Sequence, residues 1–236
     1  MEIPLPAEWY FSGKDPMKNL KQTMFLAAFV SISLVLYGLI LTSSGKTLIW
    51  SEYLSIVLCF LFALISFQKP LIIAALAMTL GADYCLVIYN PMQQLWGMVF
   101  FLGAQTLYAI YLHRQGLHKG FLFTRIGLSV TAMVVAILVL GEKADALALV
   151  SMCYYVNLIM NLLCAFARFR DNRLMAIGFV LFLLCDTVIG LQVAAGGYLP
   201  IHEGSLIHRI IFPGFHLSWL FYLPSQVLIT LSSRRI

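Results

Sequence analysis

Charged residues are scarce in this sequence. Asp, Glu, Lys and Arg make up 11% of its residues, against roughly 25% in soluble globular proteins. Apolar residues make up 61%, and the mean hydropathy is +0.92. A soluble globular domain is excluded, because too few polar side chains are present to cover its surface. We predict an integral, multi-pass membrane protein, located in the cell (inner) membrane if the source is bacterial.

The familiar signatures of catalytic and metal sites are also missing. The sequence has no phosphate-binding glycine loop, no Gly-x-Ser-x-Gly elbow and no His-Glu-x-x-His pair. Its five cysteines lie inside apolar runs and form no Cys-x-x-Cys pattern, so we interpret them as packing residues. We therefore expect no metal and no cofactor. No linker is long enough to separate a second domain.

Long apolar runs fill most of the chain. A helix needs about 20 apolar residues to cross a hydrocarbon core of about 30 Å. The turn signal Asn90-Pro91 divides one long run into two helices. The predicted spans are Met24–Thr42, Tyr53–Phe67, Leu71–Tyr89, Gln94–Leu112, Leu122–Leu140, Ala146–Phe166, Leu174–Ala194 and Ile210–Leu231. The expected fold is therefore all-α, a polytopic bundle of about eight transmembrane helices at 23–232, with terminal segments at 1–22 and 233–236.

The distribution of Lys and Arg predicts the orientation, because these residues are retained in cytoplasmic loops. The side that holds both termini carries twelve of them: Lys14, Lys18, Lys21, Lys69, Arg114, Lys119, Arg125, Arg168, Arg170, Arg173, Arg234 and Arg235. The opposite side carries three: Lys46, Lys143 and Arg209. Both termini are thus predicted to be cytoplasmic. This asymmetry, together with contact with membrane lipids, accounts for the pI near 9.0. No nucleic-acid partner is therefore expected. The sequence indicates no protein partner.

Two aspartates lie inside predicted spans. A charged side chain near the bilayer centre costs about 2.5–3.5 kcal/mol on insertion scales, so an intramembrane carboxylate indicates a functional site. Asp83 and Asp186 lie roughly 20 Å and 18 Å from the cytoplasmic face at 1.5 Å of rise per residue. No Lys or Arg at that depth is predicted to pair with them. We interpret them as one site.

Other polar residues fall in the same spans and are candidates for substrate binding or for support of the acids. Each also has a structural interpretation, since Asn, Gln and Tyr often only bridge membrane helices, and His216 fits a core residue equally well. Asn157 and Asn161 are four residues apart and share a helix face. The candidates are Gln105, Tyr155, Asn157, Asn161, His216, Tyr222 and Gln226.

Three blocks of sequence resemble a known family. Gly81-Ala-Asp-Tyr-Cys-Leu86, followed by Gly97-Met-Val-Phe100 and Leu107-Tyr108-Ala-Ile-Tyr111, resembles the first block of the YhhN family of lysoplasmalogenase-like membrane proteins. Gly178-Phe-Val-Leu-Phe-Leu-Leu-Cys-Asp186 resembles its Gly-x-x-x-Phe-x-x-Ser-Asp motif, with Cys185 in place of Ser. Phe221-Tyr222-Leu-Pro-Ser-Gln226 resembles its Tyr-Tyr-x-Ala-Gln ending, and Gln105 stands where the family usually has His.

The resemblance implies hydrolysis of the vinyl ether bond of a lysoplasmalogen, which is a lysophospholipid substrate. Such a reaction needs an acid, a nearby anion and a positioned water, and two buried carboxyl groups can supply all three. As a hypothesis, one of Asp83 and Asp186 donates the proton and the other stabilises the cation and activates water. The sequence does not assign the two roles.

Two other classes of protein remain open at this point. A proton- or cation-coupled transporter would use the same aspartates as ion sites. A metal-dependent intramembrane hydrolase would need several histidines around zinc, and only His216 lies inside a predicted span.

Overall fold

The computed structural model describes residues 16–66, 68–197, 202, 205–212 and 216–232. Within these residues it contains helices and no β-strand, so the predicted all-α class is confirmed. The helices are α1 (Pro16–Thr42), α2 (Gly45–Ile65), α3 (Pro70–Asp83), α4 (Gln94–His113), α5 (Gly120–Leu140), α6 (Ala146–Ala167), α7 (Phe169–Gly197), α8 (Leu206–Ile211) and α9 (Leu217–Ser232). A π-helical segment η1 (Tyr84–Ile88) continues α3, and a 3-10 turn η2 (Gly141–Lys143) follows α5.

The lengths of these helices confirm a polytopic membrane protein. Among the described residues, α1 to α7 are each long and apolar enough to cross a membrane. α9 is apolar as well but has only 16 residues. The prediction of about eight spans is thus met by seven full-length helices and one shorter helix.

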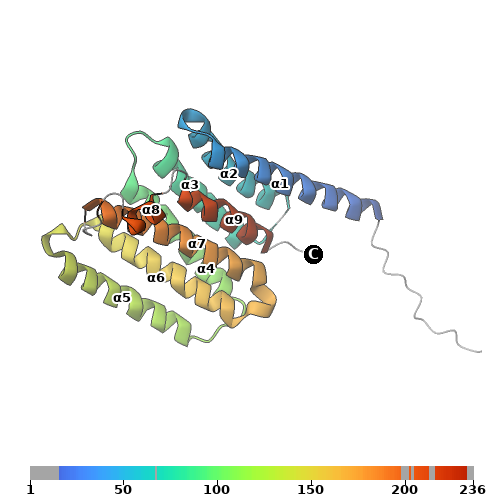
Figure 1. Cartoon of the computed structure of the whole chain (residues 1–236). Coiled ribbons are helices and arrows are strands. Elements are labelled where there is room, and N and C mark those ends of the chain that lie inside the picture. The colour runs from blue at the N-terminus through green and yellow to red at the C-terminus, as the bar shows by residue number, and fades with distance from the viewer. Residues whose placement is uncertain (1–15, 67, 198–201, 203–204, 213–215, 233–236) are drawn as a thin grey trace, which may run out of the picture.

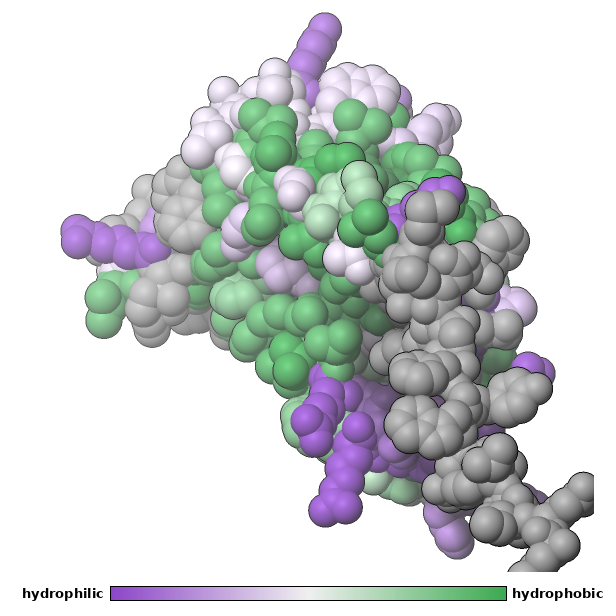
Figure 2. Space-filling view, turned by 90° about the vertical axis from the view of Figure 1, so that its right-hand side faces the viewer, coloured by the Kyte–Doolittle hydropathy of each residue, from purple (hydrophilic) through white to green (hydrophobic). Residues whose placement is uncertain are grey.

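The membrane-spanning helices alternate in direction, so the start of α1 and the end of α9 lie at the same end of the bundle (Figure 1). We call this the basic end, because its loops carry Lys69, Arg114, Lys119 and Arg168. We call the opposite end the far end. Figure 2 looks at the basic end and shows hydrophilic side chains gathered in the lower part of the view, next to hydrophobic surface.

Two predicted spans have different boundaries in the structure. The second was predicted to begin at Tyr53, but α2 begins at Gly45 and therefore includes Glu52. The last was predicted as one helix over Ile210–Leu231, but α8 ends at Ile211 and α9 begins at Leu217. Hydropathy locates apolar residues and does not detect a break of the helix inside an apolar run, which explains the second difference.

The core of the bundle lies between α2, α3, α4, α6, α7 and α9. α5 is peripheral, since only Arg125 and Ala136 are buried on it. α7 and α9 approach most tightly at Gly178, where an added Cβ would lie 2.7 Å from Ile229 Cγ1 and 3.1 Å from the Ser225 carbonyl oxygen. Small residues permit such close approach of membrane helices. This contact fixes α9, which carries Tyr222, against α7, which carries Asp186.

Candidate active site

Asp83 is the last residue of α3, and its side chain is 3% exposed. Pro70 occupies the first turn of α3, a position that suits proline, and so fixes where the helix begins. The Tyr222 hydroxyl on α9 donates a 2.7 Å hydrogen bond to Asp83 Oδ2. The chain continues directly into the π-helical segment η1, a conformation that is frequent at functional sites. The predicted candidates Asp83 and Tyr222 therefore contact each other.

Asp186 lies on α7 and receives a hydrogen bond from a different tyrosine. The Tyr154 hydroxyl on α6 donates to Asp186 Oδ2. The sequence analysis named Tyr155 instead, and consecutive helix residues point about 100° apart. The Tyr155 hydroxyl forms a 2.9 Å hydrogen bond with Thr187 Oγ1, which ties α6 to α7 beside the acid without touching it. Tyr154 is thus a site residue that the sequence analysis missed.

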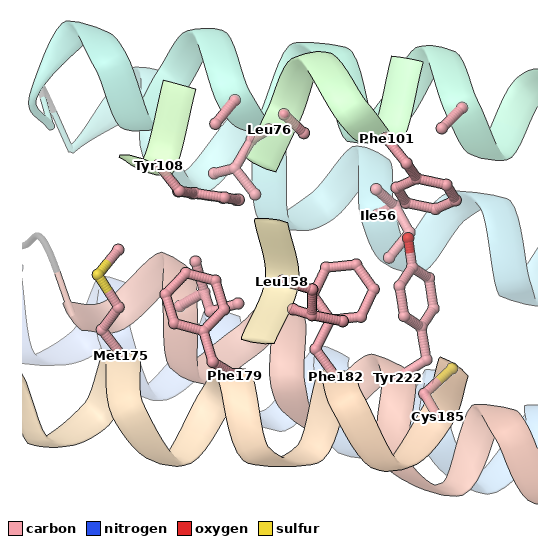
Figure 3. Close-up of a cluster of buried hydrophobic side chains, with 14 of the residues drawn as sticks. Ile56, Leu76, Phe101, Tyr108, Leu158, Met175, Phe179, Phe182, Cys185 and Tyr222 are labelled. Atoms are coloured by element: carbon pink, nitrogen blue, oxygen red, sulfur yellow. The ribbon is translucent and has the colours of Figure 1, made fainter. Parts of the chain in front are cut away.

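Aromatic rings join the two acid–tyrosine pairs into one region. The Phe101 ring on α4 lies 5.7 Å from the Tyr154 ring and 6.3 Å from the Tyr222 ring, measured between centroids. The Phe182 ring lies 5.5 Å from that of Tyr222. In Figure 3 the Tyr222 hydroxyl points across the core towards Phe101 and Ile56.

A third carboxyl group belongs to this region. Glu52 on α2 is 6% exposed, and its Oε1 has no hydrogen-bond partner among the described residues. α2 packs against α3 and η1, the two segments that meet at Asp83, so Glu52 and Asp83 belong to the same region of the core. Glu52 was absent from the predicted candidates because the predicted second span began one residue later. That predicted span was shorter than the required length of about 20 residues, which was the available signal.

His216 lies outside α9 in the structure, immediately before its first residue. Its side chain is 54% exposed, and its Nδ1 is 3.9 Å from Glu52 Oε1. The prediction that His216 lies inside the last span is therefore wrong, since the helix starts one residue after it. It lies at the far end of the bundle, between the surface and the carboxyl groups.

Three predicted site residues form a separate network nearer the basic end. The Arg125 guanidinium on α5 donates 2.8 Å hydrogen bonds to Asn157 Oδ1 and Asn161 Oδ1. Asn161 Nδ2 in turn donates to the carbonyl oxygen and to Oε1 of Gln105, each at 2.8 Å. Asn161 is seven residues beyond Tyr154 on α6, about 10 Å along the helix. We call Arg125, Asn157, Asn161 and Gln105 the arginine network, and we interpret its contacts as bridges between α4, α5 and α6.

Gln226 lies on α9 one turn beyond Tyr222 and is completely buried. Its Nε2 lies 3.5 Å from Ser225 Oγ, and its Oε1 has no partner among the described residues. It makes no direct contact with either aspartate that the structure records.

Within the described part of the chain, no group of three or more His, Cys, Asp and Glu side chains is arranged to hold a metal ion. The groups that this site presents are carboxyl and hydroxyl groups inside an apolar bundle. Carboxyl groups in such a place can give or take a proton and can stabilise a cation.

The fold and these buried carboxyl groups define a polytopic membrane protein with an acidic site in its core. The family model of the YhhN family matches residues 47–233, which is most of the sequence. The chain belongs to the YhhN family, and the resemblance carried by the three sequence blocks is confirmed. No curated protein and no solved structure matches the chain.

Proposed function

We propose that the protein is an intramembrane hydrolase that cleaves the vinyl ether bond of a lysoplasmalogen. The products would be a fatty aldehyde and a glycerophospho-alcohol. The main support is that Asp83 and Asp186 each accept a hydrogen bond from a buried tyrosine hydroxyl in the same aromatic region of the core. Membership of the YhhN family agrees with this reaction.

The chemistry begins with transfer of a proton from a carboxyl group to the vinyl carbon that does not bear oxygen. The resulting oxocarbenium ion is attacked at its other carbon by water, whose extra proton passes to the second carboxylate. The hemiacetal formed in this way collapses, its hydroxyl proton moves to the departing alkoxide, and aldehyde and alcohol are released. The sum is one vinyl ether and one water giving one aldehyde and one alcohol.

The two tyrosines position the carboxyl groups for these steps. Each tyrosine donates to the Oδ2 atom of its partner, so the Oδ1 atoms of Asp83 and Asp186 remain available to face a substrate. A hydrogen bond to a carboxylate also fixes its rotamer, which keeps reacting atoms in line. The aspartates are the groups proposed to touch the substrate, and Tyr154 and Tyr222 are positioning residues.

Glu52 adds a carboxyl group that can hold a proton for the reaction. Two buried carboxyl groups that are neighbours cannot both be ionised at a small energetic cost, so such a pair retains one proton. The pair of Glu52 and Asp83 is therefore the proposed acid. Asp186, which accepts its hydrogen bond from Tyr154 on α6, is the proposed base.

A membrane-embedded site suits a single-chain lipid. The alkenyl chain can stay in apolar surroundings while its first double bond reaches the core, and the reaction needs no path to bulk water beyond one for water and headgroup. The proposed partners are accordingly the lysophospholipid substrate and the membrane lipids. If the source is bacterial, the proposed location is the inner membrane.

A proton- or cation-coupled transporter is the second candidate. It is favoured by one observation: Glu52, which is buried in the core, lies 3.9 Å from exposed His216 at the far end. Chains of acidic and histidine side chains are typical of proton pathways in membranes. Proton-driven uptake of a substrate into vesicles, lost in Asp83→Asn, would favour this function over hydrolysis.

The decisive experiment measures aldehyde release from a lysoplasmalogen by the detergent-purified protein. Asp83→Asn and Asp186→Asn should each lower the rate at least about 100-fold, because a general acid or base contributes 10²–10⁴-fold. Asp171→Asn is the matched control, since Asp171 is exposed at the basic end. Full activity in either buried variant, or no aldehyde from the unmodified protein, would refute the proposal.

A further inference from the structure

Among the described residues, two completely buried glutamines each have one side-chain amide atom without a hydrogen-bond partner. Gln105 on α4 and Gln226 on α9 are both 0% exposed. Among the described residues, Gln105 Nε2 has no acceptor and Gln226 Oε1 has no donor. An unpaired polar group in an apolar interior costs about 1–3 kcal/mol of stability. Two such atoms therefore indicate a bound partner that completes their hydrogen bonds.

The orientation of the Gln105 amide follows from its neighbours. Arg125 can only donate, so the oxygen of Asn161 must face Arg125 and its Nδ2 must face Gln105. Gln105 therefore presents Oε1 to Asn161, and its Nε2 is left as a donor at the end of the arginine network. An exchange of the amide oxygen and nitrogen would place two donors against each other.

The Gln226 amide is oriented by Ser225. The Ser225 hydroxyl donates to the Tyr222 carbonyl oxygen at 2.6 Å, so its oxygen can only accept from Gln226. Gln226 Nε2 lies on that side, at 3.5 Å. The oxygen Oε1 is consequently the atom left as a free acceptor.

The two amides lie at one level of the bundle, next to the proposed acids. α4 and α9 both run from the far end to the basic end (Figure 1). Phe101 and Tyr222 are in ring contact between these helices, and Gln105 and Gln226 each follow by four residues. Residues four apart share a helix face, about 6 Å along the axis. A free donor on α4 and a free acceptor on α9 therefore lie one turn from Tyr222 and its partner Asp83.

We propose that Gln105 Nε2 and Gln226 Oε1 together bind the free hydroxyl group of the glycerol of a lysolipid. A hydroxyl oxygen accepts one hydrogen bond and donates one, which matches the two free amide atoms. In a lysoplasmalogen the hydroxyl-bearing carbon is bonded to the carbon that carries the vinyl ether oxygen. A double bond held at the aspartates thus places this hydroxyl beside the glutamines. A lipid with a second acyl chain has no such hydroxyl and is rejected.

This inference rests on the proposed hydrolysis and names its specificity-determining residues. The test compares three vinyl ether lysolipids: one with the free hydroxyl, one with that hydroxyl methylated and one with it removed. Aldehyde release is measured as kcat/KM for the unmodified protein, Gln105→Met and Gln226→Met. Methionine keeps the length and the volume of the side chain and removes its hydrogen bonds. Gln94→Met is the matched control, because Gln94 is exposed on α4.

Each variant should lower kcat/KM about tenfold for the hydroxyl substrate, which is the usual effect of one lost hydrogen bond to a ligand. Neither should change turnover of the lipid without the hydroxyl by more than about twofold, because that lipid makes neither bond. The ether oxygen of the methylated lipid can accept a hydrogen bond but cannot donate one. Gln105→Met should therefore lower kcat/KM for this lipid, and Gln226→Met should not. Equal losses on all three lipids would assign the glutamines to packing, or to a bound water, and would overturn the inference.

Failure of the hydrolase proposal can be separated from failure of this inference. A saturated ether lysolipid has no vinyl group to protonate, so it measures binding alone. The melting temperature of the unmodified protein should rise with the hydroxyl form of this lipid and not with the form that lacks the hydroxyl. Gln226→Met should abolish that difference. Equal stabilisation by both lipids would overturn the inference whether or not aldehyde is released.

Discussion

The arginine network and the acidic site are both buried polar regions, but they differ in how completely they are paired. At the Arg125 end of the network, Arg125 donates to two asparagines, and Asn161 donates to Gln105. Next to the acidic site, Glu52 Oε1, Gln226 Oε1 and Gln105 Nε2 have no hydrogen-bond partner in the part of the chain that the structure describes. Pairing at the Arg125 end indicates a structural role, and the unpaired atoms beside the acids indicate a place for a ligand.

The largest effect on stability is expected from breaking the paired region. Arg125→Met removes the donor from Asn157 Oδ1 and Asn161 Oδ1, leaving two buried acceptors unpaired. The free energy of unfolding in detergent should fall by about 2–6 kcal/mol, at about 1–3 kcal/mol for each acceptor. Arg114→Met is the control, because Arg114 is exposed at the basic end. Equal unfolding of the two variants would contradict a structural role for the network.

The next effect concerns activity. Tyr222→Phe removes the hydrogen bond to Asp83 and keeps the ring contacts with Phe101 and Phe182. Aldehyde release should fall about 10- to 100-fold, because a hydrogen bond to a charged group contributes about 1.5–3 kcal/mol. Tyr89→Phe, at an exposed tyrosine near the far end, should retain full activity. An unchanged rate in Tyr222→Phe would show that Asp83 needs no positioning.

A smaller effect, in the opposite direction, is expected at Gln226. Gln226→Met replaces an unpaired buried acceptor by an apolar side chain of similar size, so it should raise the melting temperature by about 2–4 °C. Gln105→Met should instead lower it, because Gln105 Oε1 accepts from Asn161. Thermal unfolding of both variants without lipid makes the comparison. A lower melting temperature for Gln226→Met would mean that its amide stabilises the fold.

The smallest effect is expected at His216. Its side chain is half exposed and lies 3.9 Å from Glu52, and exposed pairs contribute little. His216→Ala should therefore change aldehyde release by less than about twofold under the same assay. A larger loss would place His216 in the proton path of the site and would strengthen the transporter alternative.

The sequence predicted the number of apolar helices well, because crossing a hydrocarbon core requires long runs without charge. The predicted helix boundaries are wrong where a charged residue lies inside a helix or where a helix ends within an apolar stretch. Lys46 and Glu52 made the start of α2 look like a loop, although Glu52 is buried in the bundle. The break between α8 and α9 lies in an apolar stretch, where hydropathy gives no signal and only the dipeptide Pro213-Gly214 indicates a helix end.

The sequence also predicted only part of the site. Asp83 and Asp186 are charges inside apolar runs, which sequence detects directly, and Tyr222 was among the candidates. The choice between Tyr154 and Tyr155 depends on the rotation of α6, which sequence spacing leaves open. Asn157 and Asn161 were correctly placed on one helix face. Their partner Arg125 falls within the predicted span Leu122–Leu140 but was interpreted only as an orientation signal on the cytoplasmic side, so the network was missed.

The shortness of α9 has a consequence for the surrounding bilayer. Sixteen residues at 1.5 Å each extend about 24 Å, against a hydrocarbon core of about 30 Å. A short helix is accommodated by local thinning of the membrane, at a cost of fractions of a kcal/mol per Å of mismatch. Lipid headgroups beside α9 would then sit deeper than elsewhere around the protein. The bilayer itself would thus bring the polar end of a single-chain lipid towards the level of Gln226 and Tyr222.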